Sequence, residues 1–420
     1  MSDELEAAEA PAVPAHGAGQ TAGQTAGKAA GETVFGVIAA VGVCHGLNDM
    51  MQSLLPAIYP EFKANLGLTF GQIGLVTLCY QLTASILQPL IGFYADKRPT
   101  PMALPGGALF SLAGLAILSI AHSYGVILIG ACVLGMGSAV FHPESSRVAR
   151  MAAGPRPGLA QAMFQVGGNA GSAIGPLAAA VFVVRYGQSS LAAFALLALV
   201  SCAILWNVGL WYRRHGLERL KAGARGQGAH AALPRGRAAR GLLILLALIF
   251  SKFVYLASIT SYFTFYLIHQ FGASVRTAQL HLFVFLAAVA AGTLLGGPLG
   301  DRVGRKTVIW FSILGALPFT LLLPHVDLFW TGPLAIVIGL ILASAFPAIV
   351  VFAQELAPGN VGMVAGLCFG LSFGLGGIGA AVLGHLADLK GIAFVYQVCA
   401  FLPAIGLLAA FLPRVEKPKH

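Results

Sequence analysis

The hydrophobic positions of this chain fall into long runs that short polar stretches separate. A helix needs about 20 apolar residues to cross a bilayer, and twelve of the runs reach about this length. The pattern predicts an all-α polytopic membrane protein, in which neighbouring helices satisfy the backbone wherever glycine or proline interrupts a span. The predicted spans are 34–60, 70–94, 101–121, 125–147, 158–184, 190–212, 241–268, 276–299, 305–323, 330–352, 360–386 and 392–413.

The longest polar interruption is a basic stretch over 213–240, which divides the spans into two groups of six. We therefore predict an N-terminal six-helix half over 33–212 and a C-terminal six-helix half over 241–413, joined by a cytoplasmic linker. Residues 1–32 are rich in Ala, Gly and Gln and lack the apolar core of a signal peptide. This composition predicts a disordered cytoplasmic tail, and residues 414–420 are expected to form a second one.

The two halves share landmarks at a nearly constant spacing. Asp301 follows Asp96 by 301 − 96 = 205 positions. Three further pairs share a separation of 347 − 143 = 204 positions. They are Pro143 with Pro347, Gly158 with Gly362 and Gly175 with Gly379. The repeat indicates an internal duplication. Two parallel six-helix halves around a midplane site are typical of transporters.

Four polar residues interrupt the first span on one helix face. They stand at positions i, i+3, i+4 and i+7, and are His45, Asn48, Asp49 and Gln52. A carboxylate at the centre of a span costs about 2.5–3.5 kcal/mol, so this face must turn toward water or polar partners. The stripe predicts a functional site in which Asp49 couples protons. The alternative is a hydrogen-bonded cluster that only joins helices.

The charges are distributed unevenly between the two sides of the predicted bundle. With both termini on one side, that side collects every lysine and arginine except five, which are Lys63, Arg185, Lys252, Arg276 and Lys390. The positive-inside rule therefore predicts a multi-pass protein of the bacterial inner membrane with both termini in the cytoplasm. The net charge of +10 is scattered over loops of a chain that is 57% hydrophobic, which predicts a lipid environment and no nucleic-acid partner.

Several chemistries are disfavoured by what the sequence contains. The six cysteines all fall inside predicted spans without CxxC spacing, so neither a disulfide framework nor a metal site is expected. The glycine-rich runs follow no strand, and no Walker sequence is present. We therefore expect neither an enzyme nor an ATP-driven pump, but a chain that needs no cofactor and uses the proton gradient.

Two loops resemble the signature loops 2–3 and 8–9 of the major facilitator superfamily. They are Gly92-x-x-x-Asp96-Lys97-Arg98 and the fuller Gly297-x-x-x-Asp301-Arg302-x-Gly304-Arg305-Lys306. The first copy departs from the family pattern at Pro99 and Thr100. Four segments resemble the fosmidomycin resistance branch more closely: HGLNDMMQSLLPAIYP, GQIGLVTLCYQL, FHPESSRVARMA and GLAQAMFQVGGNAGSAIGP. The resemblance implies a proton-coupled exporter of fosmidomycin-like antibiotics.

The resemblance also implies residues for gating and antiport. The loop carboxylates can meet arginines or the positive N-terminal ends of helices. The gating candidates are Gly92, Asp96, Arg147, Gly297, Asp301, Arg302 and Arg305. Span five resembles the antiporter motif of drug/proton exchangers through Gly167, Gly168, Gly171, Gly175 and Pro176, although ordinary small-residue packing explains the same pattern.

Two more charged residues lie inside spans. Glu144 can pair with Arg147 and is a second candidate for proton coupling. Lys252 stands 252 − 48 = 204 positions after Asn48, so the repeat places it opposite the first polar stripe; the alternative is snorkelling. A second stripe, of Gln161, Gln165 and Asn169, is expected to line the cavity. The candidate substrate-binding residues are His45, Asn48, Gln52, Gln81, His142, Gln165, Asn169, Lys252 and Tyr255.

These observations predict a monomeric secondary transporter that exports a small anionic substrate in exchange for protons. A proton symporter that imports an organic anion shares every feature except the glycine pattern of span five. A membrane scaffold, receptor or enzyme is the alternative from another class, and the duplicated halves and the lack of a sizeable soluble domain weigh against it.

Overall fold

The computed structural model describes residues 32–68, 70–178, 182–216, 218 and 234–413. These residues are helical almost throughout, and the described part of the chain contains no β-strand. The predicted tails lie outside the described residues apart from Glu32, and so does most of the predicted linker.

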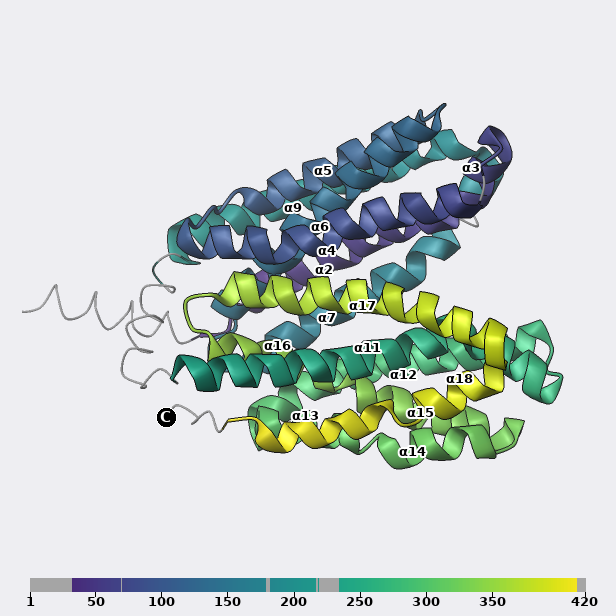
Figure 1. Ribbon diagram of the computed structural model, residues 1–420. Helices are drawn as coiled ribbons and strands as arrows, with labels where there is room; N and C mark the ends of the chain where they lie inside the picture. The colour runs from purple at the N-terminus through teal and green to yellow at the C-terminus, as the bar shows by residue number, and fades with distance from the viewer. Residues whose placement is uncertain (1–31, 69, 179–181, 217, 219–233, 414–420) are drawn as a thin grey trace, which may run out of the picture.

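The N-terminal half contains six long helices joined by short turns (Figure 1). Its elements are α2 Phe35–Ala57, α3 Tyr59–Leu66, α4 Phe70–Lys97, α5 Ala103–Ser119, α6 Tyr124–Ala152, α7 Pro157–Ala178, α8 Val184–Tyr186, η2 Gln188–Ser190, α9 Leu191–Trp211 and η3 Tyr212–Gly216.

The C-terminal half repeats this plan, but three of its predicted spans are each built from two helical segments, namely α13 with α14, α15 with α16, and α18 with η5. Its elements are α11 Arg235–Phe271, α12 Val275–Val303, α13 Arg305–Leu314, α14 Leu317–Leu322, η4 Leu323–His325, α15 Leu328–Ala343, α16 Ala345–Leu356, α17 Val361–Lys390, α18 Ile392–Cys399 and η5 Leu402–Phe411.

A helical element occupies each of the twelve predicted spans. Within the described residues, nine helical stretches are long and apolar enough to cross a membrane by length and composition. The other three predicted spans are α5, a shorter apolar helix of 17 residues, and α2 and α7, which carry the two polar stripes. The chain is thus an all-α membrane protein of two six-helix halves.

Helix boundaries differ most from the prediction at the basic loops. The predicted linker 213–240 is shorter in the structure, because η3 continues from α9 to Gly216 and α11 already begins at Arg235, directly after Pro234. Proline has no backbone N–H to lose at a helix start, and basic side chains extend a helix beyond its apolar segment without cost. Hydropathy alone marks the apolar segment and misses these turns.

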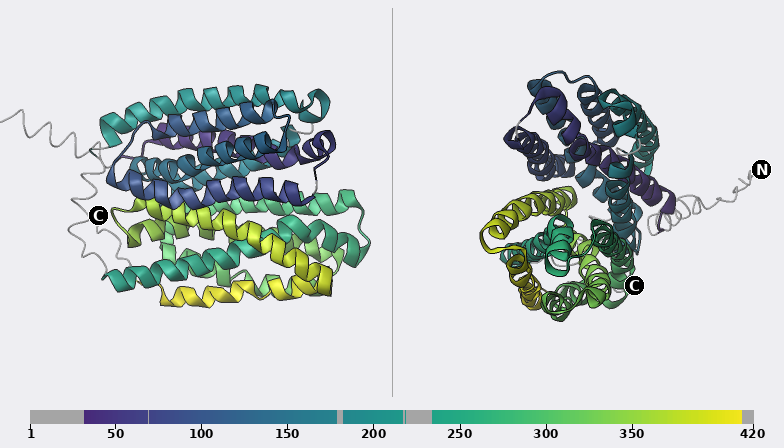
Figure 2. Two further views of the ribbon diagram at one scale, coloured as in Figure 1. Left: turned by 45° about the horizontal axis from the view of Figure 1, so that its top comes forward. Right: turned by 90° about the vertical axis from the view of Figure 1, so that its right-hand side faces the viewer.

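The two halves face each other as separate groups of helices (Figure 2). Their most extensive contacts join α4 to α17 and α7 to α12. One hydrophobic cluster runs through both halves at one end of the bundle and includes Ile38, Val148, Ile249 and Ile349. Toward the other end, each half has its own cluster, around Leu54 in the first half and around Phe263 and Tyr396 in the second. Among the described residues, the halves therefore share a hydrophobic core at one end and have separate cores toward the other.

The end at which the halves pack together also carries Asp96, Arg150, Asp301, Arg305 and Glu355, and is called the basic end below. Arg150 and Arg305 lie 3.7 and 3.3 Å from the carboxylate of Glu355, so this charged layer links helices of both halves. The polar stripe of α2 lies farther along the bundle, between this layer and the end where the halves have separate cores.

Candidate functional site

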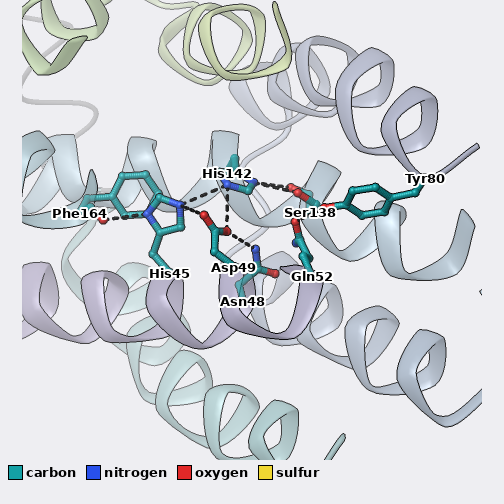
Figure 3. A network of polar contacts seen from close by, with 8 residues as sticks. All are labelled: His45, Asn48, Asp49, Gln52, Tyr80, Ser138, His142 and Phe164. Carbon is teal, nitrogen blue, oxygen red and sulfur yellow. Dashed lines mark hydrogen bonds and ion pairs between the residues drawn. The ribbon is translucent and has the colours of Figure 1, made fainter. Parts of the chain in front are cut away.

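Two histidines and an aspartate form a buried cluster between α2 and α6. His45 Nε2 lies 3.2 Å from His142 Nε2 and 3.3 Å from Asp49 Oδ2, and His142 Nε2 lies 3.5 Å from Asp49 Oδ1. Figure 3 shows the three side chains pointing toward one another. Helical spacing brings His45 and Asp49 together on successive turns of α2, whereas His142 joins them through the packing of α6.

Surrounding groups fix the orientation of this cluster. His45 Nδ1 lies 2.7 Å from the carbonyl oxygen of Phe164, whose ring stacks on the imidazole at 4.1 Å. His142 Nδ1 lies 3.0 Å from the carbonyl oxygen of Ser138, one turn earlier on α6. Asn48 donates a hydrogen bond of 3.0 Å to Asp49 Oδ1. Each of the three side chains therefore has an outer partner that limits its rotation.

Asp49 lies between two cavities. The first, of about 110 Å³, lies between the two halves, and its polar lining consists of His45, Asp49, Gln165, Asn169, Ser172, Lys252, Thr293 and Ser372. The second, of about 210 Å³, is lined by Asp49, Gln52, Ser53, Tyr59, Thr77, Tyr80 and Gln81, among others. Tyr80 donates a hydrogen bond of 2.6 Å to Gln52 Oε1 at its wall. A carboxylate in this position can be reached from either cavity.

Lys252 contributes the cationic group of the first cavity. Its side chain is buried, and its Nζ lies 4.7 and 5.1 Å from the ring centroids of Phe346 and Phe253. Among the described residues, no carboxylate lies within 4.0 Å of this ammonium group. Asp49 faces the two imidazoles instead of Lys252. The aromatic faces stabilise the cation only in part.

Four residues predicted to bind the substrate or to line the cavity line neither of the two cavities. Asn48 and His142 belong to the cluster around Asp49. Tyr255 is buried in the hydrophobic cluster of the C-terminal half and lines neither cavity. Leu256 takes the expected place, because position i+4 stays closer to the helix face of Lys252 than position i+3. Gln161 also lies outside both cavities and accepts a hydrogen bond of 3.0 Å from Ser146, nearer the basic end. Gln165 and Asn169 do line the first cavity.

The two loop aspartates make equivalent contacts across the interface between the halves. Both oxygens of Asp96 accept hydrogen bonds from the backbone N–H groups of Gly362 and Met363, at 3.0 and 2.9 Å. Asp301 accepts from Gly158 and Leu159 in the same way, at 2.9 and 3.0 Å. Each carboxylate thus caps the N-terminus of a helix in the opposite half, α17 or α7, where the helix dipole favours an anion.

Close helix packing accompanies these caps. The backbone of Gly92 lies against Gly362, and that of Gly297 lies against Gly158, so neither interface has room for a side chain. Arg305 pairs with Asp301 at 3.2 Å, whereas Arg302 is exposed.

Glu144 belongs to the basic end and lines neither cavity. Its Oε1 lies 3.3 Å from Arg147 Nη1, and Arg147 Nε lies 3.5 Å from Asp96. The three buried groups form a chain that leads from α6 to the capped terminus of α17. The geometry associates Glu144 with the interface between the halves instead of with Asp49.

The glycines of span five pack α7 against the site helix α2. A side chain at Gly167 or Gly171 would collide with the backbone carbonyl of Gly42 or Gly46. Gly168 lies against the Nε2 edge of the His45 ring and beside Asp49 Oδ2, and Gly175 lies beside Ser53. Pro176 lies within α7, and its side chain is outside the described residues. This packing sets the distance between α2 and α7, as small residues do in membrane helices.

Several site residues had only weak signals in the sequence. Phe253 is adjacent to Lys252 and Phe346 precedes a repeated proline, but aromatic residues are common in spans. Ser138 stands four residues before His142, a spacing that does suggest contact. No metal site is predicted from the sequence, yet the structure groups three potential metal ligands, His45, Asp49 and His142, within 4.8 Å of one another.

Comparison with known proteins agrees with this architecture. The chain matches the Major Facilitator Superfamily over residues 41–376 and 250–420. It is 55% identical over 381 residues to the fosmidomycin resistance protein of Escherichia coli (strain K12). The aligned region covers 91% of this chain and 93% of that protein. It is 41% identical over 386 residues to the MFS-type transporter YfnC of Bacillus subtilis (strain 168), with 92% and 94% covered.

Solved structures show the same fold at low sequence identity. The E. coli fucose:proton symporter FucP superposes with a TM-score of 0.69 at 16% identity, over 90% of this chain and 98% of that one. The proton:xylose symporter XylE superposes with a TM-score of 0.67 at 15% identity, over 90% and 95%. Together with the sequence matches, these similarities show that the chain is a transporter of the Major Facilitator Superfamily, in the branch of the fosmidomycin resistance proteins.

Proposed function

We propose that this transporter exports fosmidomycin-like anionic antibiotics, or related small molecules, in exchange for protons. The E. coli relative supports the class of substrate through its name and its 55% identity. The mechanism rests on two groups that line one cavity between the halves, the ammonium of Lys252 and the carboxylate of Asp49.

The observation that carries the proposal is the placement of Lys252. A buried ammonium group with no carboxylate neighbour in the described part of the chain is costly in a membrane and marks a functional site. A phosphonate or other small anion in the first cavity would supply the missing counter-charge. Lysine offers three donors to such a group, and the cavity walls add amide and hydroxyl groups from Gln165, Asn169 and Ser372.

Asp49 is proposed as the proton-coupling residue. It shares the first cavity with Lys252. An anionic substrate bound there would therefore lie close to the Asp49 carboxylate, and the two negative charges would repel each other. Entry of the anion favours protonation of Asp49. Once the substrate has left, a proton on Asp49 neutralises the charge of its carboxylate. His45 and His142 contact both oxygens of Asp49, which places two more proton-binding groups beside it.

Alternating access is proposed to operate through the basic end. The caps that Asp96 and Asp301 place on α17 and α7 hold the halves together at this end. They must separate before the cavity can open to that side, whereas each half keeps its own core at the other end. Glu144 and Arg147 extend the Asp96 cap toward the middle of α6. The structure corresponds to the state with the basic end closed.

The basic end is proposed to face the cytoplasm of the bacterial inner membrane. The positive-inside rule supports this orientation, because the basic loops and both termini fall on that side. The same proposal places the tails 1–32 and 414–420 and the linker between the halves in the cytoplasm. The chain is proposed to work as a monomer, since one copy contains both halves of the cavity.

Binding of fosmidomycin to the purified protein tests the role of Lys252. Lys252→Gln removes the charge and keeps most of the side-chain length, so we expect it to lose the anion. Lys252→Arg keeps the charge but presents a planar group, so we expect it to retain part of the affinity. Lys390→Gln is the matched control, because Lys390 is exposed at the C-terminus of α17, away from both cavities.

Wild-type affinity in Lys252→Gln would show that this lysine does not bind the anion. Loss of binding in Lys390→Gln as well would show a nonspecific effect of charge, and would equally contradict the proposal.

A further inference from the structure

The spacing of the ligand atoms in the His45, Asp49 and His142 cluster is that of a metal site. The three edges between the imidazole Nε2 atoms and the nearest carboxylate oxygens are 3.2, 3.3 and 3.5 Å. In tetrahedral zinc sites the metal–ligand bonds are about 2.0–2.2 Å, which sets the distance between two ligand atoms at about 3.3–3.6 Å. The cluster therefore already has the dimensions of one face of a tetrahedron around such an ion.

The hydrogen bonds of the two histidines leave the correct nitrogens free for a cation. Each Nδ1 faces a backbone carbonyl oxygen, of Phe164 or Ser138, and a carbonyl can only accept. His142 Nδ1 also lies 3.1 Å from the hydroxyl of Ser138, which can accept from the same N–H group. With the proton on Nδ1 of each ring, Nε2 carries the lone pair that a metal ion needs. Histidines that bind metals show this arrangement almost always, with the second nitrogen donating to a carbonyl or carboxylate. Asn48, which donates to Asp49, provides the outer partner of the carboxylate.

With both protons on Nδ1, two lone pairs face each other at 3.2 Å beside a carboxylate, and a cation between them would remove their repulsion. A single proton would satisfy one edge of the triangle and leave the other two without a donor. One divalent ion at the centre would contact all three groups at once. The three similar edges thus fit one shared ion better than one shared proton.

We propose that His45, Asp49 and His142 bind one divalent transition-metal ion of the zinc type through two imidazole nitrogens and one carboxylate. The combination of two histidines and an acidic residue is a known zinc ligand set, which leaves the fourth position open. Here that position faces the first cavity, because His45 and Asp49 line it, while His142 closes the site from behind. Binding requires no movement of the helices and does not depend on the exported substrate.

The ion would occupy the groups that the proposed function assigns to proton coupling. A transporter with the metal bound could not release or take up a proton at Asp49. Metal binding would therefore compete with the transport cycle, and this consequence, unlike the binding itself, rests on the proposed function.

Equilibrium dialysis of the full chain against Co²⁺ tests the site. The protein is purified in detergent without a histidine tag, and Co²⁺ is chosen because its visible absorption reports tetrahedral coordination. We expect one Co²⁺ per chain, with the tetrahedral spectrum, and its displacement by Zn²⁺. His142→Gln should weaken binding by more than about 100-fold, since even the loss of an outer partner costs about 10- to 100-fold.

His281→Gln is the matched control, because it removes a histidine that lies on α12 and donates to Thr277 instead of to this cluster. Asp49→Asn is the second test variant, because it keeps the shape of the side chain and replaces a carboxylate oxygen by a weaker ligand. Circular dichroism and the elution volume establish that each variant is folded. The site is refuted if the wild-type protein shows no saturable binding, or if His142→Gln and Asp49→Asn bind Co²⁺ as His281→Gln does.

The metal measurement and the transport proposal can fail independently. Export in a chelating buffer concerns only the proposed function, and Co²⁺ binding by the purified protein concerns only the metal site. A chain that exports but binds no metal would overturn the inference and leave the proposed function intact.

Discussion

At the scale of single residues, Asp49 lies where the histidine cluster meets both cavities. Its carboxylate contacts His45 and His142 and lines both cavities, and among the residues that the structure describes no other acidic one lines either of the two. Lys252 faces the same first cavity from the opposite half of the repeat. A negative group and a positive group around one small cavity couple the binding of an anion to the protonation of Asp49, and such a coupling free energy is what proton-driven transport requires.

Asp49→Asn is expected to separate transport from coupling. The amide keeps the size and the hydrogen bond from Asn48 but cannot carry the charge that a proton must neutralise. We expect uphill export driven by a proton gradient to be abolished, while substrate exchange without a gradient continues. The measurement is fosmidomycin flux in proteoliposomes, with and without an imposed gradient. If the variant still concentrates the drug, Asp49 is not the coupling residue, and Glu144 becomes the candidate.

At the scale of helices, the two loop carboxylates connect elements that are distant in sequence. Asp96 at the end of α4 caps α17, and Asp301 near the end of α12 caps α7. An anion at a partly buried helix N-terminus contributes up to about 2 kcal/mol. Two such caps, with the glycine contacts beside them, are enough to decide which side of the transporter is open.

Asp96→Asn is expected to slow turnover without a comparable loss of substrate affinity. The loss of up to about 2 kcal/mol would reduce the ratio of closed to open molecules at the basic end by up to about 30-fold. Steady-state export and equilibrium binding, measured on the same preparation, separate the two effects. Asp327→Asn provides the control, because Asp327 caps α15 within one half, by accepting from Trp330. Unchanged turnover in Asp96→Asn, or an equal loss in Asp327→Asn, would contradict the assignment of Asp96.

Periodicity and the repeat predicted much of this arrangement, and packing determined the rest. The spacing of His45 and Asp49 fixes their common face, and the offset between the halves places Lys252 across from them. The sequence also suggests that Asp96 and Asp301 meet arginines or helix ends. It does not identify α17 and α7, because pairing across the halves depends on how the bundles dock. For the same reason, the contact of His142 with Asp49 and the aromatic surroundings of Lys252 could not be predicted.

At the scale of the whole molecule, the distribution of the core indicates which side is closed. One hydrophobic cluster joins both halves at the basic end, whereas the opposite end has two separate clusters. Opening the basic end must therefore expose or rearrange shared apolar surface, which makes the caps and the common core act together.

Cysteine labelling tests the proposed orientation. His215 lies in η3 at the basic end and Lys390 at the C-terminus of α17, and both side chains are exposed. In a variant that lacks the six native cysteines, we expect His215→Cys to react with impermeant reagents only from the cytoplasm, and Lys390→Cys only from outside. Gly216 is unsuitable for this purpose because it is buried against Tyr212. Labelling of both positions from one side would contradict the topology.

Proton-coupled export is tested most directly in everted membrane vesicles from a host that lacks other drug pumps. Respiration acidifies the lumen of these vesicles, so an exporter should move fosmidomycin inward while protons leave. We expect the wild-type chain to concentrate the drug in the lumen and to raise the luminal pH when the drug is added, and we expect a protonophore to abolish both effects. Emptying of preloaded vesicles, with protons and drug leaving together, would instead show a symporter that imports its substrate, and would contradict the proposed export.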